Sequence, residues 1–396
     1  MTYSFDRAPD RRSPDRVNKW TWYPPDVLPL WVADMDFRAP PPVLAALRRA
    51  VDEGVLGYEL PSKALSETVA GRMQRLYGWS VDPSSVVAVT GIVSGFNVAA
   101  RAFGASRKKG YLIQPPVYNE FHSVQANTGI KEYEAPLLER AKGNILRYEI
   151  DWDAFEKQVS KARVFILCNP HNPIGQIYSR RDLRRMAEMC LENDVVIISD
   201  EIHSELLLGG QKFTPIAAQS KAIAQQTITL VSPSKTFNVP GLFCGFAIIS
   251  NPDLRAQYAR VVDQLRLHVS SMGLFAARTA FSGECDDWLH ELLAYLTANR
   301  DFVVDYAREY LPDVRLTKPD ATYLAWLDCR ELVRQGRITG TPYEFFLNEA
   351  KVAFGEGRIY GESSRGYVRL NFGCTRRTLK QALDRVRDSL YRRKRG

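Results

Sequence analysis

Lys235 lies in the segment Ser232-Pro233-Ser234-Lys235-Thr236-Phe237-Asn238, which directly follows a predicted strand, Thr227–Val231. A lysine flanked by hydroxyl side chains at a strand exit suits a Schiff base beside a phosphate group, because the hydroxyls can donate hydrogen bonds to the anion. Taken alone the signal is weak, since a lysine is far more often a solvated surface charge. The interpretation therefore depends on what the neighbouring strands carry.

The strand before Lys235 is one of six short apolar runs in the middle of the chain. Consecutive positions in them are apolar, as in strands that are buried on both faces. Helix-length segments with apolar residues at spacings of three and four lie between several of them, as at Ser94–Phe103 and Arg180–Asn193. The alternation predicts an α/β fold with a mostly parallel sheet, helices on both faces and ligands at the carboxyl ends of the strands. The predicted strands are Val86–Thr90, Gly110–Gln114, Arg163–Cys168, Val195–Ser199, Thr227–Val231 and Gly245–Ser250.

The two ends of the chain have a different character. The N-terminal residues form an arm that is rich in Trp and Pro, and the C-terminal third begins with a long helical pattern. Short strands near Tyr323–Asp328 and Tyr367–Asn371 and a helix from about Arg377 complete it. We therefore expect three parts: an arm that joins a small domain (1–45), a large domain (46–284) and a smaller α+β domain (285–396).

Three further segments at predicted strand ends carry residues that fit one cofactor, pyridoxal phosphate (PLP). Asp200, in Ile198-Ser199-Asp200-Glu201-Ile202-His203, could keep the ring nitrogen of PLP protonated, which this cofactor needs as an electron sink. Asn172, in Asn169-Pro170-His171-Asn172-Pro173-Ile174-Gly175, can point its amide at the phenolic oxygen from a rigid turn. Thr90-Gly91-Ile92-Val93-Ser94-Gly95 offers a helix N-terminus to a single phosphate. Taken singly, Asp200 could equally be a helix N-cap and the Asn172 segment a structural turn.

Composition argues against several classes of protein. No stretch approaches the roughly 20 apolar residues of a membrane span, and the start lacks the apolar run of a secretory signal, so we expect a cytoplasmic protein. The net charge is +8, but the basic residues are dispersed except in the tail 392–395, which argues against a nucleic-acid partner. The six cysteines lack the spacing of a zinc site, so we expect neither metal nor disulfide.

In combination, these segments resemble the fold-type I PLP-dependent enzymes, the aspartate aminotransferase superfamily. The ordered set N-P-x-N-P-x-G, S-D-E-I-H, S-x-S-K-T-F-N and R-L-N carries this likeness, which covers essentially the whole chain. More narrowly, the chain resembles the MalY/PatB type of cystathionine β-lyase through Trp31–Phe37, Gly57-Tyr58, Pro116-Val117-Tyr118 and Ser234–Asn238. The resemblance implies a lyase that cleaves the Cβ–S bond of cystathionine, cysteine or a cysteine S-conjugate and releases a thiol, pyruvate and ammonia.

The resemblance also implies a role for each matching residue. Lys235 would hold PLP as a Schiff base and remove the Cα proton, and Asp200 would pair with the ring nitrogen. Arg369, in Val368–Asn371, would grip the substrate α-carboxylate in a bidentate fork, with Asn172 nearby. The other implied contacts are ring stacking by Tyr118, cofactor contact by His203, phosphate contacts by Val93, Ser94 and Ser232, and a reach by Tyr58 to the phosphate of the partner subunit in a homodimer.

Two positions depart from the ordinary aminotransferases of the superfamily. His203 stands where many of them have a tyrosine, and Phe243 where many carry an arginine that binds the phosphate. Both departures are compatible with the lyase branch without proving it. A true aminotransferase would use the same residues and is the alternative, and a regulatory protein on the same scaffold is a third interpretation. The complete catalytic set argues against a purely structural role.

Overall fold

The structure, a computed structural model, describes residues 3–13, 15–104 and 110–392. Within them the first sheet has the strand order β2-β10-β9-β8-β7-β3-β4. All neighbours in it are parallel except those of β10, which is antiparallel to both β2 and β9. The predicted, mostly parallel sheet is therefore confirmed. Its strands are β2 (Val86–Val89), β3 (Gly110–Ile113), β4 (Glu132–Glu134), β7 (Ala162–Cys168), β8 (Val196–Asp200), β9 (Thr227–Val231) and β10 (Gly245–Ile249).

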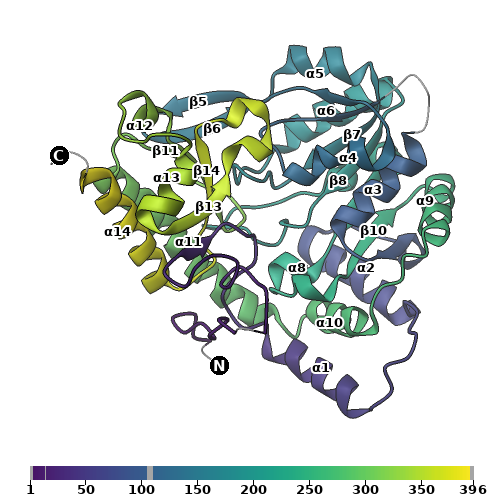
Figure 1. The fold of residues 1–396 in the computed structure, drawn as a ribbon. Coiled ribbons are helices and arrows are strands. Elements are labelled where there is room, and N and C mark those ends of the chain that lie inside the picture. The colour runs from purple at the N-terminus through teal and green to yellow at the C-terminus, as the bar shows by residue number, and fades with distance from the viewer. Residues whose placement is uncertain (1–2, 14, 105–109, 393–396) are drawn as a thin grey trace.

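Both faces of this sheet are covered by helices (Figure 1). Side chains on β7 alternate between two cores, so that Ile166 packs with α3 (Ile92–Phe103) and Leu167 with α6 (Arg180–Glu192). This double burial explains why consecutive positions of the strands are apolar. The other helices around the sheet are α2 (Lys63–Tyr77), α4 (Ser123–Thr128), α5 (Trp152–Val159), α7 (Lys221–Gln225), α8 (Pro233–Thr236), α9 (Pro252–Gln264) and α10 (Ser271–Ser282).

A second sheet brings together segments that are far apart in the sequence. Its order is β1-β13-β14-β12-β11-β6-β5, and β1 of the N-terminal arm pairs in parallel with β13. The hairpin β5–β6 comes from the middle of the chain, so all three expected parts contribute strands. The division at residues 46 and 285 stays a prediction. The strands are β1 (Leu28–Leu30), β5 (Leu138–Lys142), β6 (Ile145–Glu149), β11 (Arg315–Thr317), β12 (Leu324–Asp328), β13 (Val352–Glu356) and β14 (Tyr367–Asn371).

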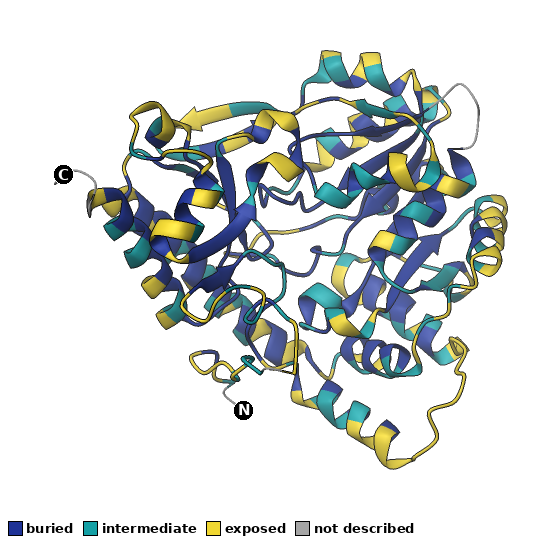
Figure 2. Ribbon diagram, in the orientation of Figure 1, coloured by how far each residue is buried: buried dark blue, intermediate teal, exposed yellow. Residues whose placement is uncertain are grey.

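Helices of the C-terminal part pack against this second sheet. The long α11 (Asp286–Tyr310) and the final α14 (Arg376–Arg392) match the predicted helical patterns, and α12 (Arg330–Arg334) and α13 (Pro342–Phe345) are short. Figure 2 shows buried strands and helices whose outer faces are exposed. The segment 53–62, between α1 (Pro41–Asp52) and α2, is exposed throughout.

Two expectations from composition bear on the described residues. None of the helices formed by residues 3–13, 15–104 and 110–392 is both long and apolar enough to cross a membrane. All six cysteines are buried and free, as expected for small apolar residues rather than disulfide partners. The basic tail lies outside the described residues from position 393 onward.

Candidate active site

A cavity of about 870 Å³ opens where the carboxyl ends of β7, β8 and β9 face the second sheet and the N-terminal arm. Carboxyl ends of parallel strands meet at one edge of a sheet, which explains how polar residues from separate loops gather there. Eight of the predicted site residues line this cavity: Val93, Ser94, Tyr118, Asn172, Asp200, His203, Lys235 and Arg369.

Lys235 lies in α8, directly after β9. Its Nζ donates a hydrogen bond to the backbone carbonyl of Ala33 at 2.7 Å. Burial and, next, the charge of Arg369 lower the pKa of Lys235 to about 8, although Asp34 and Asp200 act in the opposite direction. A sizeable fraction of the amine is therefore neutral near neutral pH, which a nucleophile or a base requires.

Asp200 ends β8 and faces the cavity. Its carboxylate accepts a hydrogen bond from the backbone N–H of Ile202 at 3.1 Å. Turns follow it rather than a helix, so the N-cap alternative is wrong. Burial raises the pKa of Asp200 to about 7, against the effects of that hydrogen bond and of Lys235. A buried carboxylate of this kind favours a cationic partner such as a protonated ring nitrogen.

His203 lies next to these two groups and is neutral. Burial, followed by the positive charges of Lys235 and Arg369, lowers the pKa of His203 to about 3. Among the described residues its Nδ1 has no hydrogen-bond partner. The imidazole can therefore contact a ligand in the cavity without adding charge to it.

Arg369, in the middle of β14, contacts Asn172 across the cavity. Its Nη1 donates to Oδ1 of Asn172 at 3.0 Å, and its Nη2 donates to the backbone carbonyl of Trp31 at 2.9 Å. The guanidinium carbon lies 5.1 Å from the centre of the Tyr360 ring. The buried Nε has no partner among the described residues. Arginine in this setting can bind a carboxylate.

Gly355 leaves room for this arginine. It pairs with Arg369 across β13 and β14. A Cβ at position 355 would lie 3.2 Å from Oη of Tyr360 and 3.6 Å from Nε of Arg369. A larger residue would therefore crowd the guanidinium.

The start of α3 provides the predicted phosphate site. Gly91 caps this helix with φ of 149°, and Val93 and Ser94 in the first turn line the cavity. The first N–H groups of a helix and its dipole attract an anion. Ser232 does not line the cavity, because its hydroxyl is close to Ser234 and donates to the carbonyl of Cys244 at 2.7 Å. Ser234 lines the cavity instead, and the phosphate contact of Ser232 stays a prediction.

Two aromatic residues of the predicted site differ in their location. Tyr118 lines the cavity, and burial raises its pKa above the ordinary value, so its hydroxyl stays protonated. Tyr58 lies in the exposed segment 53–62 and outside the cavity of its own chain. Its contact with a partner subunit stays a prediction.

Several contacts in the cavity were missed from the sequence. Trp31 and Ala33 act through backbone carbonyls, which leave no mark in a residue pattern. Tyr360 and Gly355 surround Arg369 but belong to no motif that we recognised. The sequence indicated no role for any single residue of the segment Trp31–Phe37.

The residues present fit PLP by their chemistry. A lysine with a lowered pKa, a buried carboxylate that favours a cationic partner and a helix N-terminus match the aldehyde, the ring nitrogen and the phosphate of this cofactor. Arg369 is left over for a substrate carboxylate.

Comparisons with known proteins agree with this description. The family model "Aminotransferase class I and II" matches residues 25–386. Cystathionine beta-lyase PatB of Bacillus subtilis is 36% identical, with 98% of this chain and 100% of that protein covered. Protein MalY of Escherichia coli is 29% identical over 90% of each chain. The structure of the PLP-bound C-S lyase of Staphylococcus hominis is similar, with a TM-score of 0.90, 29% identity and coverage of 99% of each chain.

The arrangement of the two sheets is that of fold type I of the PLP-dependent enzymes, as expected from the ordered motifs. The likeness to PatB extends over nearly the full length of both proteins. The chain belongs to the aminotransferase class I and II family, in its MalY/PatB-type branch.

Proposed function

We propose that this chain is a PLP-dependent C–S β-lyase that cleaves the Cβ–S bond of a sulfur-containing amino acid. The observation that carries this proposal is the joint presence in one cavity of Lys235, Asp200 and Arg369. PatB, named as a cystathionine beta-lyase, and the C-S lyase of Staphylococcus hominis support the choice of reaction. Cystathionine, cysteine and cysteine S-conjugates are the proposed substrates.

Each side chain has a proposed part in holding the cofactor. Lys235 would bind its aldehyde carbon, and Asp200 would hold the proton on its ring nitrogen. Tyr118 would cover one face of the ring, and Asn172 would donate its amide hydrogens to the phenolic oxygen. The backbone N–H groups at the start of α3, with Ser94, would bind the phosphate.

The proposed reaction removes a proton from Cα and a thiolate from Cβ. Bound PLP supplies an electron sink for the negative charge that develops at Cα. Arg369 would fix the α-carboxylate by two parallel hydrogen bonds, which orients the Cα–H bond. The amine of Lys235, freed when the substrate amine takes its place on the aldehyde carbon, would accept the Cα proton. The Cβ–S bond would break, and the sulfur would leave with the electron pair.

A homodimer is part of the proposal. The exposed segment 53–62 carries Val55, Leu56, Tyr58 and Leu60, whose side chains are all largely exposed. Neighbouring exposed apolar side chains are typical of a surface that another protein covers. We propose that a second copy of the chain covers this segment and that Tyr58 approaches its phosphate site. The cytoplasmic location stays a prediction.

Pyruvate release without a keto-acid acceptor tests the proposed reaction. Purified, PLP-loaded protein is mixed with L-cystathionine, L-cysteine or an S-alkyl-L-cysteine, and pyruvate and the visible absorption of the bound cofactor are followed together. A lyase releases pyruvate over many turnovers while the absorption persists. Absorption that bleaches after one equivalent, with no pyruvate, would overturn the proposal in favour of an aminotransferase.

A further inference from the structure

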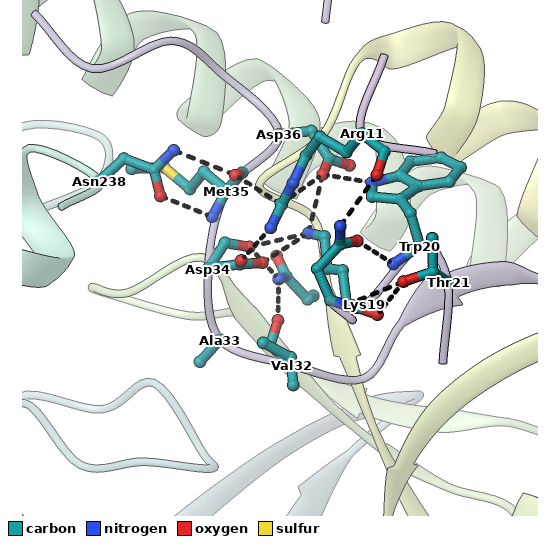
Figure 3. Close-up of polar contacts among 12 residues, drawn as sticks. Arg11, Lys19, Trp20, Thr21, Val32, Ala33, Asp34, Met35, Asp36 and Asn238 are labelled. Carbon is teal, nitrogen blue, oxygen red and sulfur yellow. Dashed lines mark hydrogen bonds and ion pairs between the residues drawn. The ribbon is translucent and has the colours of Figure 1, made fainter. Parts of the chain in front are cut away.

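Four charged side chains and one tryptophan contact one another at the edge of the cavity, which Asp34 lines, and we call this group the arm clamp: Arg11, Lys19, Trp20, Asp34 and Asp36 (Figure 3). The side chains of Lys19 and Asp36 are each only 1% exposed. Nζ of Lys19 lies 2.9 Å from Oδ1 of Asp34 and 3.0 Å from Oδ1 of Asp36. Arg11 contacts the same carboxylates at 2.8 and 3.2 Å. Two cations therefore balance two anions.

The arm clamp fixes the backbone that touches Lys235. The carbonyl of Asp34 accepts hydrogen bonds from Lys19 at 3.0 Å and from Asn371 at 2.7 Å. On the next residue, Met35, both backbone polar groups bond to the side chain of Asn238, as Figure 3 shows. The carbonyl of Ala33, one residue before Asp34, accepts the hydrogen bond of Lys235 and a second one from the hydroxyl of Tyr323 at 2.9 Å, so the arm clamp and Tyr323 together hold it in place.

The arm clamp also determines the charge that Lys235 experiences. Arg369, Asp34 and Asp200 are the charged groups that act on this amine. The other titratable side chains that line its cavity are Tyr23, Tyr118, Glu120, Cys168, His203, Cys244, Tyr343, Glu356 and Tyr360. Burial alone would raise the pKa of Asp34, but Lys19 and Arg11 lower it, so the carboxylate stays ionised. Its negative charge is balanced by the two cations of the arm clamp, which limits its effect on Lys235.

We propose that Lys19 is a positioning residue for Lys235: it neutralises Asp34 and, through the backbone of Asp34, holds the Ala33 carbonyl against the lysine amine. The importance of Lys235 itself rests on the proposed function. A cluster that only stabilised the fold would have no particular effect on this amine.

The change in the pKa of Lys235 in two variants distinguishes a positioning role of Lys19 from a role in stability alone. Lys19→Met leaves Asp34 with excess negative charge, which favours the ammonium form and raises the pKa of Lys235 above about 8. Asp34→Asn leaves Lys19 and Arg11 in excess, which favours the neutral amine and lowers this pKa. Mere loosening of the structure would admit water and raise the pKa in both variants.

The test measures the ionisation of Lys235 in the full-length, cofactor-free protein. Trace acetic anhydride is applied over a range of pH, and acetylation of Lys235 is quantified by peptide mass spectrometry. We expect the pH midpoint of Lys235 acetylation to rise by about one unit in Lys19→Met and to fall by about half a unit in Asp34→Asn. In Arg11→Met it should rise less than in Lys19→Met, because the side chain of Arg11 is 24% exposed. Arg337→Met, which removes a 2.7 Å ion pair with Asp313 away from the cavity, is the matched control and should leave the midpoint unchanged.

An upward or absent shift in Asp34→Asn would overturn the proposal, as would an unchanged midpoint in Lys19→Met. If Lys19→Met does not fold, Arg11→Met and Asp34→Asn still give the two opposite signs. Lys19→Arg, which keeps the charge, should restore the midpoint. Because neither PLP nor substrate is present, a failed lyase assay would leave this result intact.

Discussion

The arm clamp and the active-site cavity lie next to each other and both hold charged side chains, but the arm clamp places each of its charges against an opposite one. Lys19 and Asp34 contact opposite charges within 3 Å. In the cavity, the carboxylate of Asp200 accepts a hydrogen bond from the backbone N–H of Ile202. The Nε of Arg369 and the Nδ1 of His203 have no hydrogen-bond partner within the described part of the chain.

The difference distinguishes charges that are compensated within the protein from charges that are left for a ligand. A buried charge costs free energy unless an opposite charge or hydrogen bonds compensate for it. The arm clamp supplies that compensation itself, and the pKa of Lys19 is raised because Asp36 and Asp34 outweigh its burial. In the cavity the pKa of Lys235 is lowered to about 8 by burial and by Arg369. A bound ligand would provide the opposite charges and the hydrogen-bond partners that the cavity residues lack.

The largest expected difference is between Lys19 of the arm clamp and Lys235 of the cavity. Lys235→Ala should lower the rate of pyruvate release at least about 10,000-fold, because both the attachment point of the cofactor and the base at Cα are lost. The cofactor-free variant should be as stable as the original protein, since the lost amine has no opposite charge in direct contact. Lys19→Ala should instead lower the free energy of unfolding by about 3 kcal/mol. Steady-state kinetics and urea denaturation check both, and native turnover by Lys235→Ala would refute the assigned role.

Asp200 in the cavity and Asp36 in the arm clamp, both buried, should change the free energy of unfolding with opposite signs when replaced by asparagine. Asp200 has a pKa of about 7 in the folded protein, above the ordinary 3.8 of the unfolded chain. Between these values the folded state binds more protons, so the free energy of unfolding should fall as the pH rises from about 4 to about 7. Asp200→Asn should remove this decline and stabilise the cofactor-free protein by about 4 kcal/mol at pH 7.5.

Asp36→Asn is the matched comparison in the arm clamp. It takes an anion from Lys19 and Arg11 and should destabilise the protein at the same pH. Urea denaturation of both variants across this pH range is the measurement. Equal destabilisation by Asp200→Asn and Asp36→Asn would mean that the cavity carboxylate serves the fold as well.

The sequence predicts features of the site that form within a short stretch of the chain better than contacts between distant residues. Asp200 ends a strand of the first sheet, and Lys235 and Asn172 each lie shortly after one. Local apolar runs predicted those strands to within one residue at either end. The contact of Arg369 with the carbonyl of Trp31 joins residues 338 positions apart through a backbone atom. No local pattern encodes such a contact, because any side chain leaves the same carbonyl.

The second sheet was only partly predictable for a related reason. The short strands of the C-terminal third were recognised, but β1 and the β5–β6 hairpin complete the sheet from other parts of the chain. Pairing between distant short strands depends on the tertiary structure rather than on their own sequences. Burial of Lys19 was likewise invisible, since a lone lysine in a polar arm is usually solvated.

The smallest expected effect concerns the geometry of Arg369 rather than its charge. Arg369→Lys keeps the cation but loses the fork that can hold a carboxylate by two parallel hydrogen bonds. We expect kcat/KM for the amino-acid substrate to fall about 30-fold, mostly through a higher KM, which corresponds to about 2 kcal/mol. Arg376→Lys, at a site where the guanidinium contacts Asn299 and the Phe302 ring outside the cavity, is the matched control and should change KM little. If Arg369→Lys and the original protein have the same KM, the unpartnered Nε of Arg369 does not bind a substrate carboxylate. The contrast between the cavity and the arm clamp would then hold for Lys235 and Asp200 alone.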